Sequence, residues 1–133
     1  MFTYLILALV VMALFYIRLA PTDAGKWHQP PNVTADKNLK GGVLRLVRTG
    51  PDGLERLDAI ARATDRTQVL SGSVAEGMVT YVTRSRVIGF PDYTTAQQDG
   101  DMLKIHARLR FGRSDFGVNR DRIDQWLVVL QAG

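Results

Sequence analysis

The 133-residue sequence contains no cysteine, which excludes disulfide bonds, thiolate metal ligands and a cysteine nucleophile. It also lacks a phosphate-binding P-loop, a dinucleotide-binding glycine pattern and a Gly-x-Ser-x-Gly nucleophile motif. Histidine occurs only at His28 and His106, and no metal-ligand motif surrounds either residue. We therefore expect no cofactor and no metal site, and the missing motifs disfavour the familiar enzyme classes.

Charged side chains are absent before Arg18, and the run from residue 2 to residue 20 is nearly all apolar. As a helix this run would be about 28 Å long, just enough for a hydrocarbon core of about 30 Å if Arg18 extends toward the interface. Tyr4 and Tyr16 stand near its two ends, where interfacial aromatic residues belong. A cleavable signal peptide is the alternative, but the basic start and the small-x-small cleavage site of such a peptide are missing. We predict that residues 1–20 form a single transmembrane anchor.

Residues 21–42 are rich in Pro, Gly, Asp and Asn and show almost no hydrophobic periodicity. This composition predicts a linker that lifts a following domain off the membrane. Arg18 and Lys26 flank the C-terminal side of the anchor, so a strict positive-inside count favours a cytoplasmic domain. With so small a charge bias, that count decides little about orientation.

Residues 43–133 carry alternating and helical apolar patterns, and we predict that they form one small α+β domain. The expected order is a strand, a helix, four strands and a helix, at residues 43–48, 51–65, 67–74, 77–90, 92–98, 101–111 and 119–131. Short strands that follow one another favour antiparallel pairing. We expect an antiparallel sheet of mainly four to five strands, packed by two helices.

The clearest alternation runs from residue 103 to residue 111, where apolar residues alternate with Lys104, His106, Arg108 and Arg110. Residues two apart on a strand share a face, so one face is apolar and the other is basic. Arg84 and Arg86 are predicted to share a face of another strand. The candidate binding residues are Arg84, Arg86, Lys104, His106, Arg108, Arg110 and Arg113. They form either a face that is ion-paired with Asp92, Asp99 and Asp101, or a shallow site for a phosphate or a lipid headgroup.

Arginine and aspartate are densely mixed between residues 108 and 124, where the last strand gives way to the last helix. Gly112 and Gly117 indicate turns with positive φ or a close backbone approach. Asn119 is the expected N-cap of the helix, and free N–H groups beside it would favour an anion. A salt-bridged turn, in which Asp115 or Asp121 pairs with Arg108 or Arg122, explains the same residues.

The segment IHARLRFGRSDFGVNRDRID, residues 105–124, resembles the hallmark of a bacterial and plastid family known as domain of unknown function 1499. Members show an arginine- and serine-containing strand, then Gly-x-Ser-Asp-x-Gly-x-Asn-x-x-Arg, then a helix. The matching residues are Gly112, Ser114, Asp115, Gly117, Asn119 and Arg122. Ala107 and Leu109 stand where members often carry serine, Asp92 stands alone where many have paired acids, and the cysteine-bearing segment of many members is missing. The resemblance implies an exported, anchored envelope protein, hence a single-pass inner-membrane protein with a periplasmic domain, and it implies no known activity.

The leading functional hypothesis is a membrane-anchored, non-enzymatic envelope domain that binds a partner protein or anionic lipid through its basic sheet face. The alternative is a small hydrolase-like enzyme in which His106 acts as base with Asp92, Asp101 or Asp115, and arginines stabilise an oxyanion. The net charge of +4 is compatible with nucleic acid. The anchor and the lack of aromatic residues among the basic ones make nucleic acid an unlikely partner.

Overall fold

The alternating segments of the chain form one antiparallel sheet in a computed structural model that describes residues 1–132. The strands are β1 (Lys37–Leu39), β2 (Gly42–Arg48), β3 (Thr67–Ser73), β4 (Met78–Arg84), β5 (Pro91–Asp99) and β6 (Met102–Leu109). Their order across the sheet is β1-β2-β6-β5-β4-β3, so β3 to β6 follow one another as a meander. Together with the helices, this sheet confirms the predicted α+β class.

The sheet has six strands, and not the four to five that the sequence predicts. The additional strand is β1, which lies inside the 21–42 segment and pairs with β2 through Lys37 and Leu44. It is an edge strand of three residues with no buried side chain. So short and exposed a strand has no alternation of apolar residues by which a sequence pattern could reveal it.

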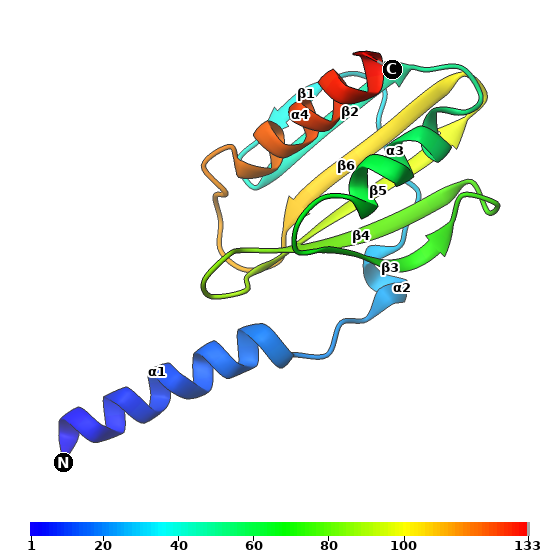
Figure 1. Ribbon diagram of the computed structural model, residues 1–133. Helices are drawn as coiled ribbons and strands as arrows, with labels where there is room; N and C mark the ends of the chain where they lie inside the picture. The colour runs from blue at the N-terminus through cyan, green and yellow to red at the C-terminus, as the bar shows by residue number, and fades with distance from the viewer. Residues whose placement is uncertain (133) are drawn as a thin grey trace.

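Helices α3 (Gly53–Arg62) and α4 (Val118–Ala132) cover one face of the sheet, as Figure 1 shows. This arrangement confirms the prediction that two helices pack on the sheet. Leu57 of α3 and Ile123 of α4 are fully buried in the core, and each such side chain stabilises the fold by about 1.5–3 kcal/mol. The rings of Tyr81 on β4 and Trp126 on α4 meet edge to face at 6.2 Å, which joins sheet and helix in the core.

The N-terminal helix α1 (Phe2–Leu19) projects away from the domain (Figure 1) and buries none of its residues. It is long and apolar enough to cross a membrane. Its C-terminal end touches the domain, since the rings of Tyr16 and Phe111 are 6.2 Å apart. The end of the apolar helix is thus in contact with the domain.

Residues 21–35, here called the strap, cross the face of the sheet opposite α3 and α4 and include the short helix α2 (Ala24–Trp27). Trp27 stacks on the ring of Tyr93, with ring centroids 4.3 Å apart. His28 Nδ1 and the hydroxyl of Thr80 share a hydrogen bond of 2.8 Å, and Val33 is buried. The first part of the 21–42 segment therefore packs on the sheet, whereas its composition predicts a free linker.

Candidate functional site

Strand β6 places Lys104, His106 and Arg108 on the outer face of the sheet, as the alternation predicts. The Lys104 ammonium lies 3.0 Å from a carboxylate oxygen of Asp99, which is one of the three expected ion-pair partners. The Arg108 guanidinium donates to the Thr95 hydroxyl at 2.9 Å and to the backbone carbonyl of Trp27. The strap therefore covers Arg108, which is engaged within the protein.

His106 is not assembled into a catalytic group with an aspartate. Burial, together with the neighbouring Arg108, lowers the pKa of His106 to about 4. In the sheet register His106 pairs with Thr95 and Asp92 pairs with Leu109, so Asp92 points to the opposite face from His106. Asp101 belongs to the turn between β5 and β6, beyond the strand on which His106 lies.

The remaining predicted binding residues lie toward the end of the sheet that is nearest to α1. Arg110 donates to the Pro21 carbonyl at 3.0 Å and to the Tyr93 hydroxyl at 3.1 Å, while Arg113 is exposed. The prediction that Arg84 and Arg86 share a strand face is wrong, because β4 ends at Arg84.

The segment that follows β4, residues 85–90, is a loop, here called the β4–β5 loop. The Ser85 hydroxyl accepts hydrogen bonds from the backbone N–H groups of Gly89 and Phe90, at 3.0 and 2.9 Å. These bonds turn the chain back toward β5, and Arg86 is exposed beyond the end of β4. Arg86 therefore belongs to the loop surface.

The side chain of Asp115, and not that of Asn119, accepts hydrogen bonds from the free backbone N–H groups at the start of α4. Its carboxylate accepts from the backbone N–H of Gly117 at 3.0 Å, and from the backbone and side-chain N–H groups of Asn119 at 3.1 and 2.9 Å. Asn119 is fully buried inside the first helical turn. Gly112 and Gly117 have φ values of +95° and +79°, which confirms the expected positive-φ turns. The Ser114 hydroxyl accepts from the N–H of Phe116 at 3.3 Å and helps to shape the bend.

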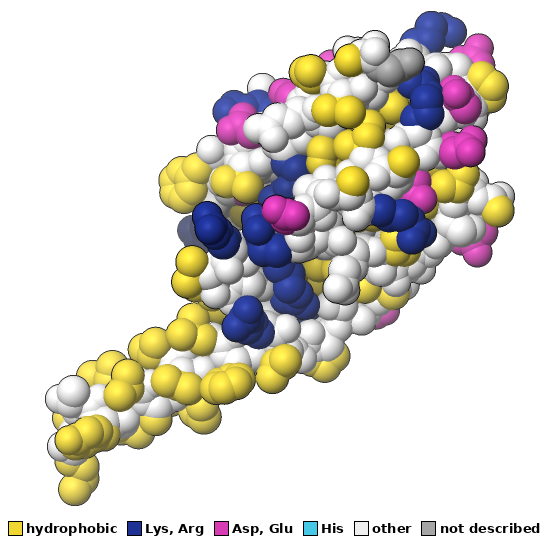
Figure 2. Space-filling model, viewed as in Figure 1, with side chains coloured by type: hydrophobic (Ala, Val, Ile, Leu, Met, Phe, Trp, Pro, Cys, Tyr) yellow, Lys and Arg dark blue, Asp and Glu magenta, His cyan; other side chains and the backbone are white. Residues whose placement is uncertain are grey.

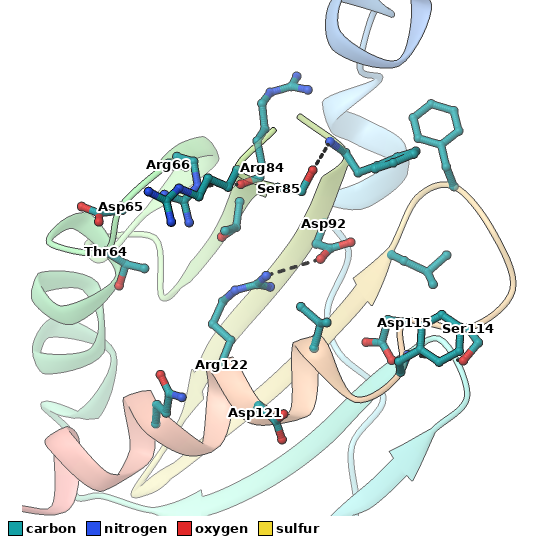
Figure 3. Close-up of a pocket in the computed structure, with 18 residues that line it drawn as sticks. Thr64, Asp65, Arg66, Arg84, Ser85, Asp92, Ser114, Asp115, Asp121 and Arg122 are labelled. Carbon is teal, nitrogen blue, oxygen red and sulfur yellow. Dashed lines mark hydrogen bonds and ion pairs between the residues drawn. The ribbon is translucent and has the colours of Figure 1, made fainter. Parts of the chain in front are cut away.

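Arg122 pairs with Asp92 (Figure 3), and not with Asp115 or Asp121, the partners that the alternative of a salt-bridged turn assigned to Arg108 or Arg122. The nearest nitrogen and oxygen are 3.4 Å apart, and each side chain is 16 % exposed. A second nitrogen of Arg122 donates to the Asn119 side-chain oxygen at 2.8 Å. Burial raises the pKa of Asp92, and the Arg122 guanidinium opposes that rise.

The turn at residues 112–117 borders a cleft of about 870 Å³ that lies between the residues after α3, the end of β4, the start of β5 and the start of α4 (Figure 3). Asp92 and Arg122 line its interior, and Phe90 and Phe111 contribute apolar walls. Charges of both signs surround this cleft.

A smaller cavity of about 210 Å³ adjoins the cleft and shares Arg66, Arg84, Ser85 and Arg86 with it. Four arginines line it, and no acidic residue does. We call this cluster, Arg18, Arg66, Arg84 and Arg86, the arginine site. Figure 2 shows Lys and Arg side chains in a band that runs from the end of the apolar N-terminal helix onto the face of the domain.

None of the four guanidinium groups has an acidic partner within 4.0 Å among residues 1–132. Arg84 donates to the Gly89 carbonyl at 2.9 Å, and Arg66 donates to the Arg84 carbonyl at 3.2 Å. Sequence reasoning missed Arg18 and Arg66 as members of the site. Arg18 and Arg66 are distant in the sequence from Arg84 and Arg86, and only the fold brings the four side chains together.

The fold and the site define an α+β domain that carries an N-terminal apolar helix and an arginine-lined cavity beside a glycine-rich turn. The family model described as "Protein of unknown function (DUF1499)" matches residues 24–130, and the chain belongs to this family. The match confirms the resemblance drawn from residues 105–124. No curated protein and no solved structure shows a significant match to the chain.

Proposed function

We propose that this protein is a membrane-anchored, non-enzymatic binding module that holds the phosphate of an anionic lipid headgroup in the arginine site. The observation that carries the proposal is the gathering of four arginines without acidic partners around one cavity. Like charges brought together are unfavourable unless an anion compensates them. The planar guanidinium, with its fork of donors, matches phosphate oxygens in geometry as well as in charge.

The position of the site supports a lipid as the source of the phosphate. Arg18 is the second-last residue of α1, so the arginine site lies where a membrane-spanning α1 would leave the hydrocarbon. Cationic side chains at that level face the headgroups directly. A membrane surface that contains anionic lipid attracts such residues, with about 1 kcal/mol for each arginine or lysine close to it.

The outer sheet face supports lipid or partner binding less well than the arginine site does. Arg108 already donates to the strap, and Lys104 is paired with Asp99. A partner bound at this face would have to displace the strap. The hydrolase alternative is also poorly supported, since His106 and Asp92 lie on opposite faces of the sheet.

The proposal includes an inner-membrane location with the domain on the periplasmic side, which follows from the family resemblance to exported envelope proteins. Because the chain has no cysteine, a single cysteine placed at the exposed Glu76 gives a clean orientation probe. A membrane-impermeant maleimide should label Glu76→Cys in intact cells whose outer membrane has been permeabilised. Labelling only after the inner membrane is disrupted would show a cytoplasmic domain.

Lipid binding is best measured with the full chain in a neutral detergent, titrated with phosphatidylglycerol or phosphatidylcholine and followed by thermal stabilisation. Phosphatidylglycerol should stabilise the protein in a salt-sensitive manner, and phosphatidylcholine should not. The double variant Arg66→Gln/Arg86→Gln removes two exposed charges of the site. Its affinity for phosphatidylglycerol should fall by about 2 kcal/mol, or roughly 30-fold.

The matched control is Arg48→Gln/Arg62→Gln, which removes two charges from exposed arginines outside the site. This control should keep the wild-type affinity. Equal stabilisation by the two lipids, or an equal loss in both double variants, would refute the arginine site. Protection by inorganic phosphate alone, at the same concentration as the lipid, would identify a site for free phosphate.

A further inference from the structure

We infer that the β4–β5 loop is a second membrane contact, and that it inserts Val87 and Ile88 into the bilayer beside α1. Val87 is 82 % exposed and Ile88 is 36 % exposed at the tip of the loop. The transfer of exposed aliphatic side chains from water into hydrocarbon is favourable, so an exposed pair at a loop tip indicates a contact site. This inference rests on the membrane anchoring contained in the proposed function, and it does not depend on binding of an anionic lipid.

The loop tip lies against the apolar helix α1, on the side of Arg18 that would be deeper in the membrane. Val87 and Ile88 line a groove of about 240 Å³ together with Val11, Leu14 and Phe15 of α1. At a rise of about 1.5 Å per residue, Phe15 lies about 5 Å and Val11 about 10 Å deeper along α1 than Arg18 does. If α1 spans a bilayer, the loop tip is therefore at the level of the outer hydrocarbon.

The flanks of the loop have the chemistry of the membrane interface. Arg84 and Arg86 precede the tip and Phe90 follows it. If the tip enters the bilayer, these cations and this aromatic ring lie nearer to the water than the two aliphatic residues do. Arginine beside the hydrocarbon can extend its guanidinium to the headgroups, and aromatic rings are enriched at the same level. This order of residues fits a bilayer better than it fits the surface of a soluble partner.

The loop is also preformed and held to the end of α1. The Ser85 N–H donates to the Phe90 carbonyl at 2.9 Å, which closes the loop at its base and satisfies two backbone groups away from lipid. Gly89 has a φ of +83°, and a Cβ there would lie only 3.1 Å from Arg18 Cγ. The glycine thus lets the stem of Arg18 pack directly against the loop, so little ordering is needed on insertion.

The test uses the cysteine-free chain, reconstituted at full length into vesicles of phosphatidylcholine and phosphatidylglycerol. A single cysteine at Val87, at Leu14 or at Glu76 carries an environment-sensitive fluorophore. Leu14→Cys reports the anchor, and Glu76→Cys reports the turn between β3 and β4, at the opposite end of β4 from the loop. Each label is quenched in turn by iodide in water and by a nitroxide on the lipid chains.

The label at residue 87 should resemble the label at residue 14, with iodide quenching several-fold weaker, and lipid-nitroxide quenching several-fold stronger, than at residue 76. If residue 87 behaves like residue 76 while residue 14 is lipid-exposed, the loop insertion is refuted and the anchor stands. Shielding of residue 87 from both quenchers would show a protein contact and would also refute it. Iodide access to residue 14 would overturn the anchor and the loop insertion together.

Discussion

Replacing Arg122 with alanine should destabilise the domain considerably more than replacing Asp92 with asparagine. The two side chains form an ion pair in which each is 16 % exposed. Burial raises the pKa of Asp92 even though Arg122 opposes the rise, so the site disfavours the charged carboxylate more than water does. Asparagine supplies a neutral side chain of the same shape, whereas Arg122→Ala leaves a carboxylate buried without its counter-charge.

The magnitude follows from the environment of the pair. Removing one partner of a fully buried pair costs about 3–5 kcal/mol, and partial solvent access reduces the expected loss for Arg122→Ala to about 2–3 kcal/mol. The lost hydrogen bond to the Asn119 side chain at 2.8 Å contributes to this loss. For a domain of this size the melting temperature should fall by about 10 °C. Asp92→Asn should cost about 1 kcal/mol or less.

The stability loss caused by Arg122→Ala should also depend on pH, and it should grow as pH rises. The folded-state pKa of Asp92 lies above its unfolded value, so the folded state binds this proton more tightly and stability falls as pH rises through the folded pKa. Arg122→Ala removes the charge that opposes the rise, so the pKa of Asp92 climbs further. The loss should be small near the unfolded pKa of about 4 and should grow as pH rises through the folded-state pKa of Asp92.

Thermal unfolding of the full chain in neutral detergent, followed by circular dichroism from pH 4.5 to pH 8, measures both effects. Arg120→Ala is the matched control, because Arg120 is an exposed neighbour paired with Asp121 on the surface. It should change stability by less than about 0.5 kcal/mol. A pH-independent loss in Arg122→Ala, or a loss no larger than that of Asp92→Asn, would refute this account of the pair.

Substitutions at three further positions test other parts of the fold in the same unfolding assay. Trp27→Ala removes the stack of the strap on Tyr93 and should cost about 1.5–3 kcal/mol, whereas Trp27→Phe should recover part of that loss. His106→Gln should abolish a pH dependence, because the pKa of His106 falls from its usual value near 6.5 to about 4 on folding. That stability is present above about pH 6.5 and is lost as pH falls toward 4, so wild type should weaken over this window and the variant should not. Tyr81→Phe deletes the hydroxyl that donates to Asp58 at 2.5 Å and should cost about 1–2 kcal/mol.

Much of the fold could be predicted because its elements follow simple periodicities. The apolar alternation of β6 predicted which side chains enter the core, and Leu103, Ile105 and Ala107 are fully buried. The helical spacing of Ile123 and Trp126 likewise predicted the buried face of α4. These patterns are local, so one sequence is enough to show them.

The candidate site was harder to predict because long-range contacts create it. The sequence predicted Arg84 and Arg86 as binding residues, but gave no sign that Arg18 and Arg66 lie beside them. The contacts of the strap were hard to predict for a similar reason, since Trp27 meets Tyr93 only after the meander has formed. Asn119 was expected as the helix cap because asparagine is common there, yet the preceding turn brings Asp115 into position to cap the helix.

Both proposed membrane contacts depend on how closely the domain is held to the anchor. A free, extended linker of residues 21–42 could reach about 75 Å, which would leave the arginine site and the β4–β5 loop far from any bilayer. Instead the Thr22 hydroxyl already shares a hydrogen bond of 3.0 Å with Tyr93. Thr22 is only four residues beyond Arg18, and four residues span at most about 14 Å. The strap therefore keeps this end of the sheet within reach of the headgroups, so loosening it through Trp27→Ala should weaken loop insertion as well as stability.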